Sequence, residues 1–145
     1  MWRLLFTFLA LALGSAVVGC EVKQCTAMGC GYTILISVSD EQGEPVERFD
    51  GTAVIEGMTY SFECSNDSAS SRVSGGDGFG FAMCSSGSIT LPFAAGSEPI
   101  IELSITSDDD LSFEGEVTPI YLVNENFNGK GCGTCTSGQA AVTLQ

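Results

Sequence analysis

The stretch that decides the fold is Tyr32-Thr33-Ile34-Leu35-Ile36-Ser37-Val38-Ser39. Every second residue is large and apolar, so Tyr32, Ile34, Ile36 and Val38 share one face of an extended chain. The run Asp40-Glu41-Gln42-Gly43-Glu44-Pro45 follows it and is rich in turn residues. The pattern therefore predicts a half-buried strand that ends at about Ser39.

The same period of two returns further along the chain. Residues 52–55 and 58–64 read as a hairpin around Glu56-Gly57, in which glycine supplies a positive φ and Met58, Tyr60, Phe62 and Cys64 share a face. The other expected strands are Phe79 to Cys84, Ser88 to Phe93, Ile100 to Thr106, Leu111 to Tyr121 and Ala140 to Leu144. No stretch keeps a helical period. The sequence thus predicts an all-β fold, an immunoglobulin-like or transthyretin-like antiparallel β-sandwich of seven to eight short strands spanning residues 31–145.

The N-terminal segment has the features of a secretory signal. Arg3 precedes an apolar run over residues 4–13, and mostly small residues lead from Gly14 to Cys20. The apolar run is short for a bilayer-spanning helix. We expect residues 1–19 to be cleaved.

The sequence Val17-Val18-Gly19-Cys20 resembles the lipobox of bacterial lipoproteins. The resemblance implies that Cys20 becomes the first residue and carries a diacylglycerol and often a third acyl chain, with residues 20–30 as a lipidated tether. Two or three acyl chains anchor a domain stably, whereas one anchors it marginally. By the same resemblance, Glu21 in place of Asp favours the outer membrane of the cell envelope. The alternative is a secreted protein cut near Ala16, with Cys20 as a half-cystine.

Composition excludes several classes of function. The 145 residues include 18 acidic and 5 basic side chains, a net charge of -13, and no histidine. Binding to nucleic acid or electrostatic attachment to anionic lipid needs a basic surface. Without histidine, the Ser-His-Asp and Cys-His catalytic arrangements are excluded. We therefore expect a non-enzymatic binding or structural module without a cofactor, whose partner is an envelope protein at a strand edge or a glycan on a sheet face.

Seven cysteines leave six once Cys20 is assigned to the lipid. In an exported chain these are expected to form disulfides. Cys64 is expected to pair with Cys84 across a Ser/Gly-rich loop, and two bridges are expected to join Cys25 and Cys30 to Cys132 and Cys135, because the terminal strands of sandwiches often lie close together. Three alternatives stay open: local pairing within each couple, a redox-active Cys132-x-x-Cys135 motif, and a four-thiolate zinc site.

Acidic clusters provide two further alternatives. Asp108, Asp109 and Asp110 form a run between two expected strands, and Asp40, Glu41 and Glu44 crowd an earlier turn. Loops of this kind bind Ca²⁺ in some proteins, so a calcium-dependent adhesion module is one alternative, although no EF-hand spacing is present. The other is an envelope hydrolase that uses paired carboxylates, drawn from Glu98, Glu102, Glu114 and Glu116.

Outside the signal, the run from Val38 to Pro45 is similar to the opening of transthyretin-like and carboxypeptidase-regulatory-like sandwiches. Together with Cys25, Gly29-Cys30, Cys64, Cys84, the stretch 117–121 and the Gly-rich stretch 128–135, it makes the chain resemble uncharacterised cysteine-containing β-sandwich lipoproteins of bacteria. This resemblance implies a β-sandwich fold and an envelope location, and it implies no particular activity.

Overall fold

The computed structural model describes residues 30–67, 70–76, 82–130 and 132–145, so the predicted signal, Cys20 and Cys25 lie outside the described residues. Within these ranges the chain forms strands and no helix, which confirms the all-β prediction. The strands are β1 (Thr33–Ser39), β2 (Phe49–Ile55), β3 (Met58–Cys64), β4 (Arg72–Gly75), β5 (Met83–Ser85), β6 (Ser88–Pro92), β7 (Ile101–Ser107), β8 (Ser112–Val117), β9 (Ile120–Asn124) and β10 (Cys135–Thr143). Ten strands replace the seven to eight expected.

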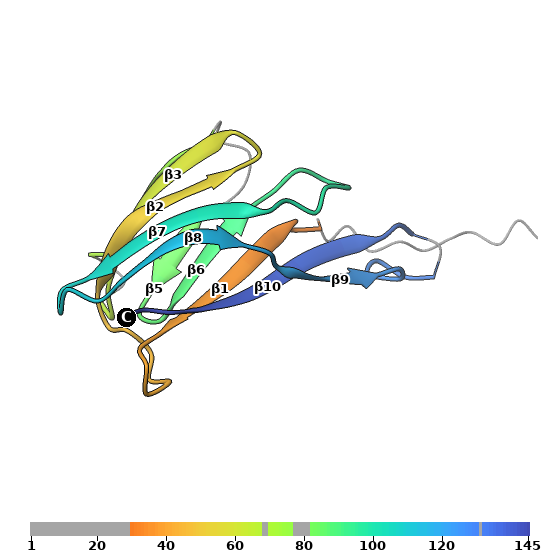
Figure 1. The fold of residues 1–145 in the computed structure, drawn as a ribbon. Helices are drawn as coiled ribbons and strands as arrows, with labels where there is room; N and C mark the ends of the chain where they lie inside the picture. The colour runs from red at the N-terminus through yellow and green to blue at the C-terminus, as the bar shows by residue number, and fades with distance from the viewer. Residues whose placement is uncertain (1–29, 68–69, 77–81, 131) are drawn as a thin grey trace, which may run out of the picture.

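The strands form two five-stranded sheets that pack face to face as a sandwich (Figure 1). Sheet A has the order β5-β6-β1-β10-β9, and sheet B has the order β4-β3-β2-β7-β8. The chain passes from sheet A (β1) to sheet B (β2 to β4), back to sheet A (β5 and β6), again to sheet B (β7 and β8), and ends in sheet A (β9 and β10). The fold class predicted from the alternating pattern is thus confirmed as a β-sandwich.

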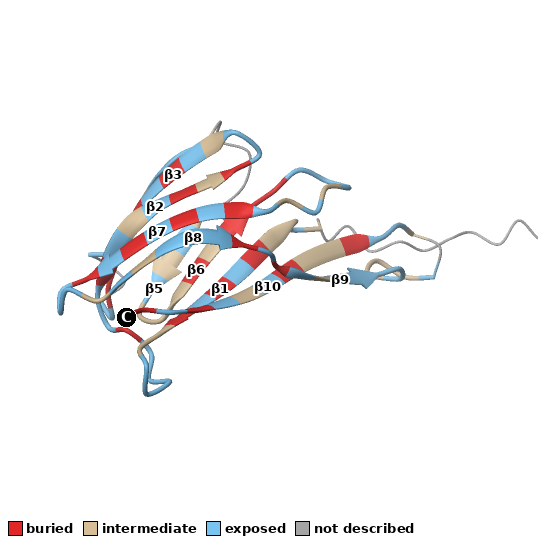
Figure 2. Ribbon diagram, in the orientation of Figure 1, coloured by how far each residue is buried: buried red, intermediate tan, exposed pale blue. Residues whose placement is uncertain are grey.

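The core lies between the inner faces of the two sheets. In Figure 2, buried and exposed residues alternate along β7, as expected for strands with one face toward a core. The prediction for the first strand is confirmed, since Ile34, Ile36 and Val38 are fully buried. Side chains that are buried to the same degree come from both sheets: Ile55, Ile89, Leu91, Ile101, Ile105 and, near the C-terminus, Leu144.

The hairpin predicted at Glu56-Gly57 is present between β2 and β3. Ile55 pairs with Met58, so the loop has two residues, and both take positive φ, 51° at Glu56 and 79° at Gly57. Such turns match the right-handed twist of the flanking strands. Tyr60, Phe62 and Cys64 share the buried face, as predicted.

Three strand predictions were wrong in detail. The last strand was expected over Ala140 to Leu144, but as β10 it already begins at Cys135. The stretch 111–121 was expected to be one strand, but it breaks at Thr118-Pro119 into β8 and β9, which belong to different sheets. Proline cannot donate a hydrogen bond to a sheet ladder, so Pro119 ends the pairing with β7. Residues 72–75, expected in a loop, form the edge strand β4 beside β3.

The antiparallel sandwich expected from the sequence is present with one exception, because β1 and β10 pair in parallel. Parallel neighbours need a long connection, and here the connection is the entire remaining domain. The register aligns Ile34 with Gly138, so both strands begin at the same end of sheet A. The predicted proximity of the terminal strands is confirmed, and it brings Cys30 next to the start of β10.

Two disulfides of the predicted set are present. Cys64 bonds Cys84, linking β3 in sheet B to β5 in sheet A. Cys30 bonds Cys135, with a Cα–Cα distance of 5.5 Å, and links the segment before β1 to β10. Cys132 is disulfide-bonded as well; the predicted partner Cys25 lies outside the described residues, and a Cys25–Cys132 bond stays a prediction.

These bonds overturn the alternatives that involve Cys30 and Cys135. A Cys132–Cys135 redox disulfide cannot form while Cys135 is bonded to Cys30, and local Cys25–Cys30 pairing is excluded for the same reason. Zinc is bound by cysteine thiolates, and a cysteine sulfur in a disulfide is not a thiolate, so Cys30 and Cys135 do not ligate zinc. Cys30 and Cys135 therefore join the two ends of the sandwich covalently and are not free thiols.

Candidate functional site

The outer face of sheet A presents a row of paired residues that crosses all five strands. Met83 on β5 pairs with Thr90 on β6, and Thr90 pairs with Leu35 on β1. Leu35 pairs with Gln139 on β10, which pairs with Ile120 on β9. Met83, Leu35 and Ile120 are 60%, 43% and 72% exposed. Because directly paired residues point to the same side of a sheet, these apolar side chains share one outer surface.

Among the described strands of sheet A, no outward position carries a charged side chain, in a protein with a net charge of -13. We call this surface the neutral face. Its outward positions include Thr33, Leu35, Ser37 and Ser39 on β1; Met83 and Ser85 on β5; Ser88 and Thr90 on β6; Ile120, Leu122 and Asn124 on β9; and Ser137, Gln139, Ala141 and Thr143 on β10. Short hydroxyl side chains surround the exposed apolar ones, so the neutral face can make short-range contacts without desolvating a charge.

The outer face of sheet B has the opposite character, and we call it the acidic face. Its outward positions include Asp50, Glu63, Glu102, Glu114, Glu116 and one cation, Arg72. Glu102 pairs directly with Glu116, and Ser104 pairs with Glu114. Charge is thereby concentrated on one of the two broad surfaces of the sandwich.

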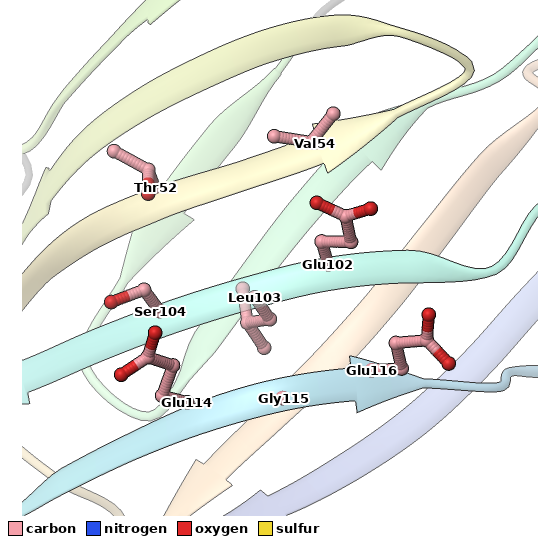
Figure 3. Close-up of a pocket in the computed structure, with 8 residues that line it drawn as sticks. All are labelled: Thr52, Val54, Glu102, Leu103, Ser104, Glu114, Gly115 and Glu116. Carbon is pink, nitrogen blue, oxygen red and sulfur yellow. The ribbon is translucent and has the colours of Figure 1, made fainter.

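A hollow of about 310 Å³ lies on the acidic face, at β2, β7 and β8. Figure 3 shows Glu102 extending from β7, Glu114 and Glu116 extending from β8, and Thr52 and Ser104 beside them. Three of the four carboxylates considered for hydrolysis therefore meet at one place, whereas Glu98 does not line this hollow. All three are exposed to solvent in an open hollow, so nothing in the described structure encloses a substrate there.

The calcium candidates Asp108, Asp109 and Asp110 lie in the turn between β7 and β8. The backbone closes this turn, with Asp110 N donating to Ser107 O at 3.1 Å and Asp110 at a φ of 63°. A second hollow of about 370 Å³ brings Asp108 and Asp109 near Asp40, but Arg48 lines it too.

Asp40 already has a structural role at this end of the sandwich. Its Oδ1 accepts hydrogen bonds from the backbone N–H groups of Gln42 and Glu44, each at 2.9 Å. Such contacts stabilise the turn that follows β1. Over the described ranges of the chain, no three carboxylates or thiolates converge closely enough to hold a metal ion.

An aromatic cluster under β9 positions this edge of the neutral face. The Phe93 ring lies edge-on to Tyr121 at 5.6 Å and to Tyr32 at 5.8 Å. The Tyr121 hydroxyl donates a hydrogen bond to the Pro99 carbonyl. Burial, followed by the nearby charges of Glu98 and Glu56, raises the pKa of Tyr121 to about 12. Tyr121 thus holds β9 inward while Ile120 and Leu122 point outward.

The sequence pattern did not identify Met83, Ile120 and Leu122 as surface residues. Residues 111–121 were treated as one strand, which hid the change of sheet after β8. The signal that could have revealed it is Pro119, because a proline inside a run of strand residues marks an edge or an end. Leu35, in contrast, was already predicted to point outward by the alternation in β1.

Comparisons with known proteins add no family or function to this description. No family model, no curated protein and no solved structure matches the chain. In the part of the chain that the structure describes, no helix is long and apolar enough to cross a membrane.

Proposed function

We propose that this chain is a lipid-anchored protein of the bacterial cell envelope that acts as a non-enzymatic binding module, with the neutral face as its contact surface. The observation that carries the proposal is the neutral face itself, which exposes Leu35, Met83, Ile120 and Leu122 among strand positions that, in the described residues, carry no charge. Exposed apolar groups gathered on one surface are typical of interaction sites.

Two features support an envelope location. Disulfides such as Cys30–Cys135 and Cys64–Cys84 persist in oxidising compartments outside the cytoplasm. The signal expected in residues 1–19 and the lipobox-like sequence before Cys20 agree with export followed by lipidation. Cys30 is ten residues beyond Cys20 in the sequence, and a fully extended segment of that length spans at most about 35 Å. A lipidated Cys20 would therefore keep the sandwich close to the membrane.

The anchor is tested by metabolic labelling with a fatty-acid probe. We expect the wild type to be labelled and Cys20→Ser to be unlabelled, because only Cys20 offers the lipobox thiol. Cys25→Ser is the matched control, since it also removes one cysteine and should remain labelled. Equal labelling of the wild type and Cys20→Ser would refute the lipid anchor.

The contact surface is tested by co-sedimentation with purified, uncharged cell-wall polysaccharide, a partner that offers hydroxyl groups and flat apolar sugar faces to the neutral face. A charge at the centre of the neutral face should weaken binding, so we expect Leu35→Glu to reduce the bound fraction by about tenfold, equivalent to 1.4 kcal/mol. Thr59→Glu places the same charge on the outer face of sheet B and should leave binding unchanged. Equal binding by both variants would rule out the neutral face as the contact surface.

The hollow on the acidic face favours a second candidate, hydrolysis by paired carboxylates. Glu102 and Glu116 are directly paired across β7 and β8 at this hollow. If they act together on a glycoside, Glu102→Gln and Glu116→Gln should each abolish activity on envelope glycans, whereas Glu98→Gln should retain it. The absence of any activity in the wild type would remove this candidate and leave the binding proposal in place.

A further inference from the structure

The two sheets have four edge strands, and three of them carry features that discourage pairing with another chain. β5 has only three residues, β4 begins with Arg72 and ends with Gly75 at a φ of 106°, and β8 presents Glu114 and Glu116. Short length, charge and backbone distortion are common means of protecting sheet edges. The fourth edge strand, β9, has five residues, Ile-Tyr-Leu-Val-Asn, and none of these features within it.

Among the described strands, β9 also exposes the most large apolar side chains. Ile120, Leu122 and Val123 are 72%, 51% and 56% exposed. Among the described strands, β10 is the only one against which β9 makes more than a marginal contact. In Figure 1, β9 lies at one end of the sandwich beside β10, at the edge of sheet A. No described strand therefore occupies its outer edge.

Charge favours a second copy of this chain as that strand. A protein with a net charge of -13 repels itself at most surfaces. If two copies met at β8, Glu114 and Glu116 would face the same residues of the other copy. The eight residues from Val117 to Asn124 contain no charge, so of the two edges that follow β7, only β9 can meet its own copy without like-charge repulsion.

We propose that β9 pairs with β9 of a second copy in antiparallel orientation, across a two-fold axis at Leu122. Leu122 then faces Leu122 of the second copy, Ile120 faces Asn124, and Tyr121 faces Val123. The pairing is isologous and closed, so it stops at a dimer. Backbone hydrogen bonds between the two edges join the two A sheets into one continuous sheet.

The symmetry of this dimer has a consequence for both surfaces. The two-fold axis of an antiparallel strand pair runs perpendicular to the sheet, so both copies present the neutral face to the same side. The two acidic faces point to the opposite side. The dimer would thus double the proposed contact surface, although self-pairing through β9 does not depend on the lipid anchor or on glycan binding.

Analytical ultracentrifugation over a wide range of protein concentration tests the proposal. The protein carries Cys20→Ser so that acyl chains do not contribute to association. We expect a concentration-dependent dimer, and we expect Leu122→Lys to be monomeric throughout because it brings two ammonium groups together on the axis. Thr59→Lys adds the same charge to the outer face of sheet B and should still dimerise. A monomeric parent protein, or an unchanged dimer in Leu122→Lys, would overturn the proposal.

A covalent measurement guards against misfolding of the lysine variant. Paired residues in antiparallel strands have Cα atoms about 4.5 to 5.5 Å apart, within the range that a disulfide spans. Leu122→Cys should therefore form a dimer on a non-reducing gel after mild oxidation. Val123→Cys is the matched control, because it faces Tyr121 rather than itself and should remain monomeric. Cross-linking of Val123→Cys but not of Leu122→Cys would contradict the proposed axis.

Discussion

Strands of both sheets alternate buried and exposed residues in the same way. The two outer faces nevertheless differ in charge. The outward side chains of sheet A are hydroxyl, amide or apolar groups, whereas those of sheet B include Glu102, Glu114 and Glu116 on adjacent strands. Each face is formed by five strands, so the number of strands does not cause the difference in charge. The residue types at the outward positions produce the difference in charge. The two surfaces can therefore serve different roles on one core.

The sheets also differ in how the chain assembles them. Sheet B consists of antiparallel neighbours, beginning with the tight β2–β3 hairpin. Sheet A joins the first and last strands in parallel and is secured by Cys30–Cys135. Contacts between distant parts of the chain cost more loop-closure entropy than those in a hairpin. Sheet A should therefore depend more on covalent links than sheet B does.

A large effect is expected from the disulfide that links the two sheets. Removing it with Cys64→Ser and Cys84→Ser should lower the free energy of unfolding by about 3 kcal/mol, because it closes a loop with a sequence separation of 20. Denaturant unfolding measures the loss. A change below about 0.5 kcal/mol would mean that this bond does not constrain the unfolded chain as the entropic account requires.

The bond at the chain ends provides a sharper comparison. If Cys25 bonds Cys132 as predicted, Cys30→Ser with Cys135→Ser leaves the ends tied and should cost only about 1 kcal/mol, whereas removal of both bridges should cost about 4 kcal/mol. If Cys30→Ser with Cys135→Ser alone lowered the free energy of unfolding by about 4 kcal/mol, no second disulfide would join the two chain ends.

Glycines in the two sheets should differ in their tolerance of a side chain. A Cβ on Gly51 in sheet B would lie 2.0 Å from the backbone oxygen of Ser104, which cannot move without breaking the β2–β7 ladder. We expect Gly51→Ala to destabilise the protein by about 2 to 3 kcal/mol.

The matched change in sheet A is Gly138→Ala. There a Cβ would meet side-chain atoms, 2.7 Å from Ile34 Cγ1 and 3.0 Å from Tyr121 Cε1. Side chains shift more easily than a paired backbone, so the expected cost is about 1 kcal/mol. Thermal denaturation compares the two variants, and the opposite order would show that sheet A is the more tightly packed sheet.

A smaller effect should appear at Tyr121, under β9. Tyr121→Phe removes the hydrogen bond to the Pro99 carbonyl and should cost about 1 kcal/mol near neutral pH. The raised pKa means that the folded state holds the phenolic proton more tightly than the unfolded state. The contribution of the protonated Tyr121 to the free energy of unfolding is therefore complete below pH 10.0 and is lost as the pH rises toward about 12. Denaturation midpoints across this range should fall more steeply for the wild type than for Tyr121→Phe. Parallel slopes would contradict the role of Tyr121.

The smallest expected effect concerns charge on the two faces. Glu102 and Glu116 face each other directly, and like charges in such pairs are destabilising. Glu116→Lys should stabilise the fold by a few tenths of a kcal/mol, with a gain that shrinks as salt increases. Gln139→Lys on the neutral face meets Leu35 and Ile120 instead and should show no such gain. If the stabilities of the two lysine variants depended equally on salt, the two faces would not differ electrostatically.

Local chemistry determined most of the individual elements. The alternation of Ile34, Ile36 and Val38 predicts their burial, and Glu56-Gly57 predicts the tight hairpin, because side-chain direction and turn geometry depend on neighbouring residues. Cys64–Cys84 also followed from sequence, since both cysteines flank one loop. These features need no knowledge of which sheet a strand joins.

Outside the β2–β3 hairpin, the tertiary structure decided which strands pair and in which direction. Pairing of β1 with β10 and separation of β8 from β9 depend on how the two sheets close over one core, and no short window of sequence records that choice. For the same reason Met83, Leu35 and Ile120 become one surface only in the folded chain, where register across five strands aligns residues far apart in sequence. The sequence by itself determined that these strands have an inner and an outer face. The packing of distant strands determined that one outer face is neutral and that β9 is left at its edge.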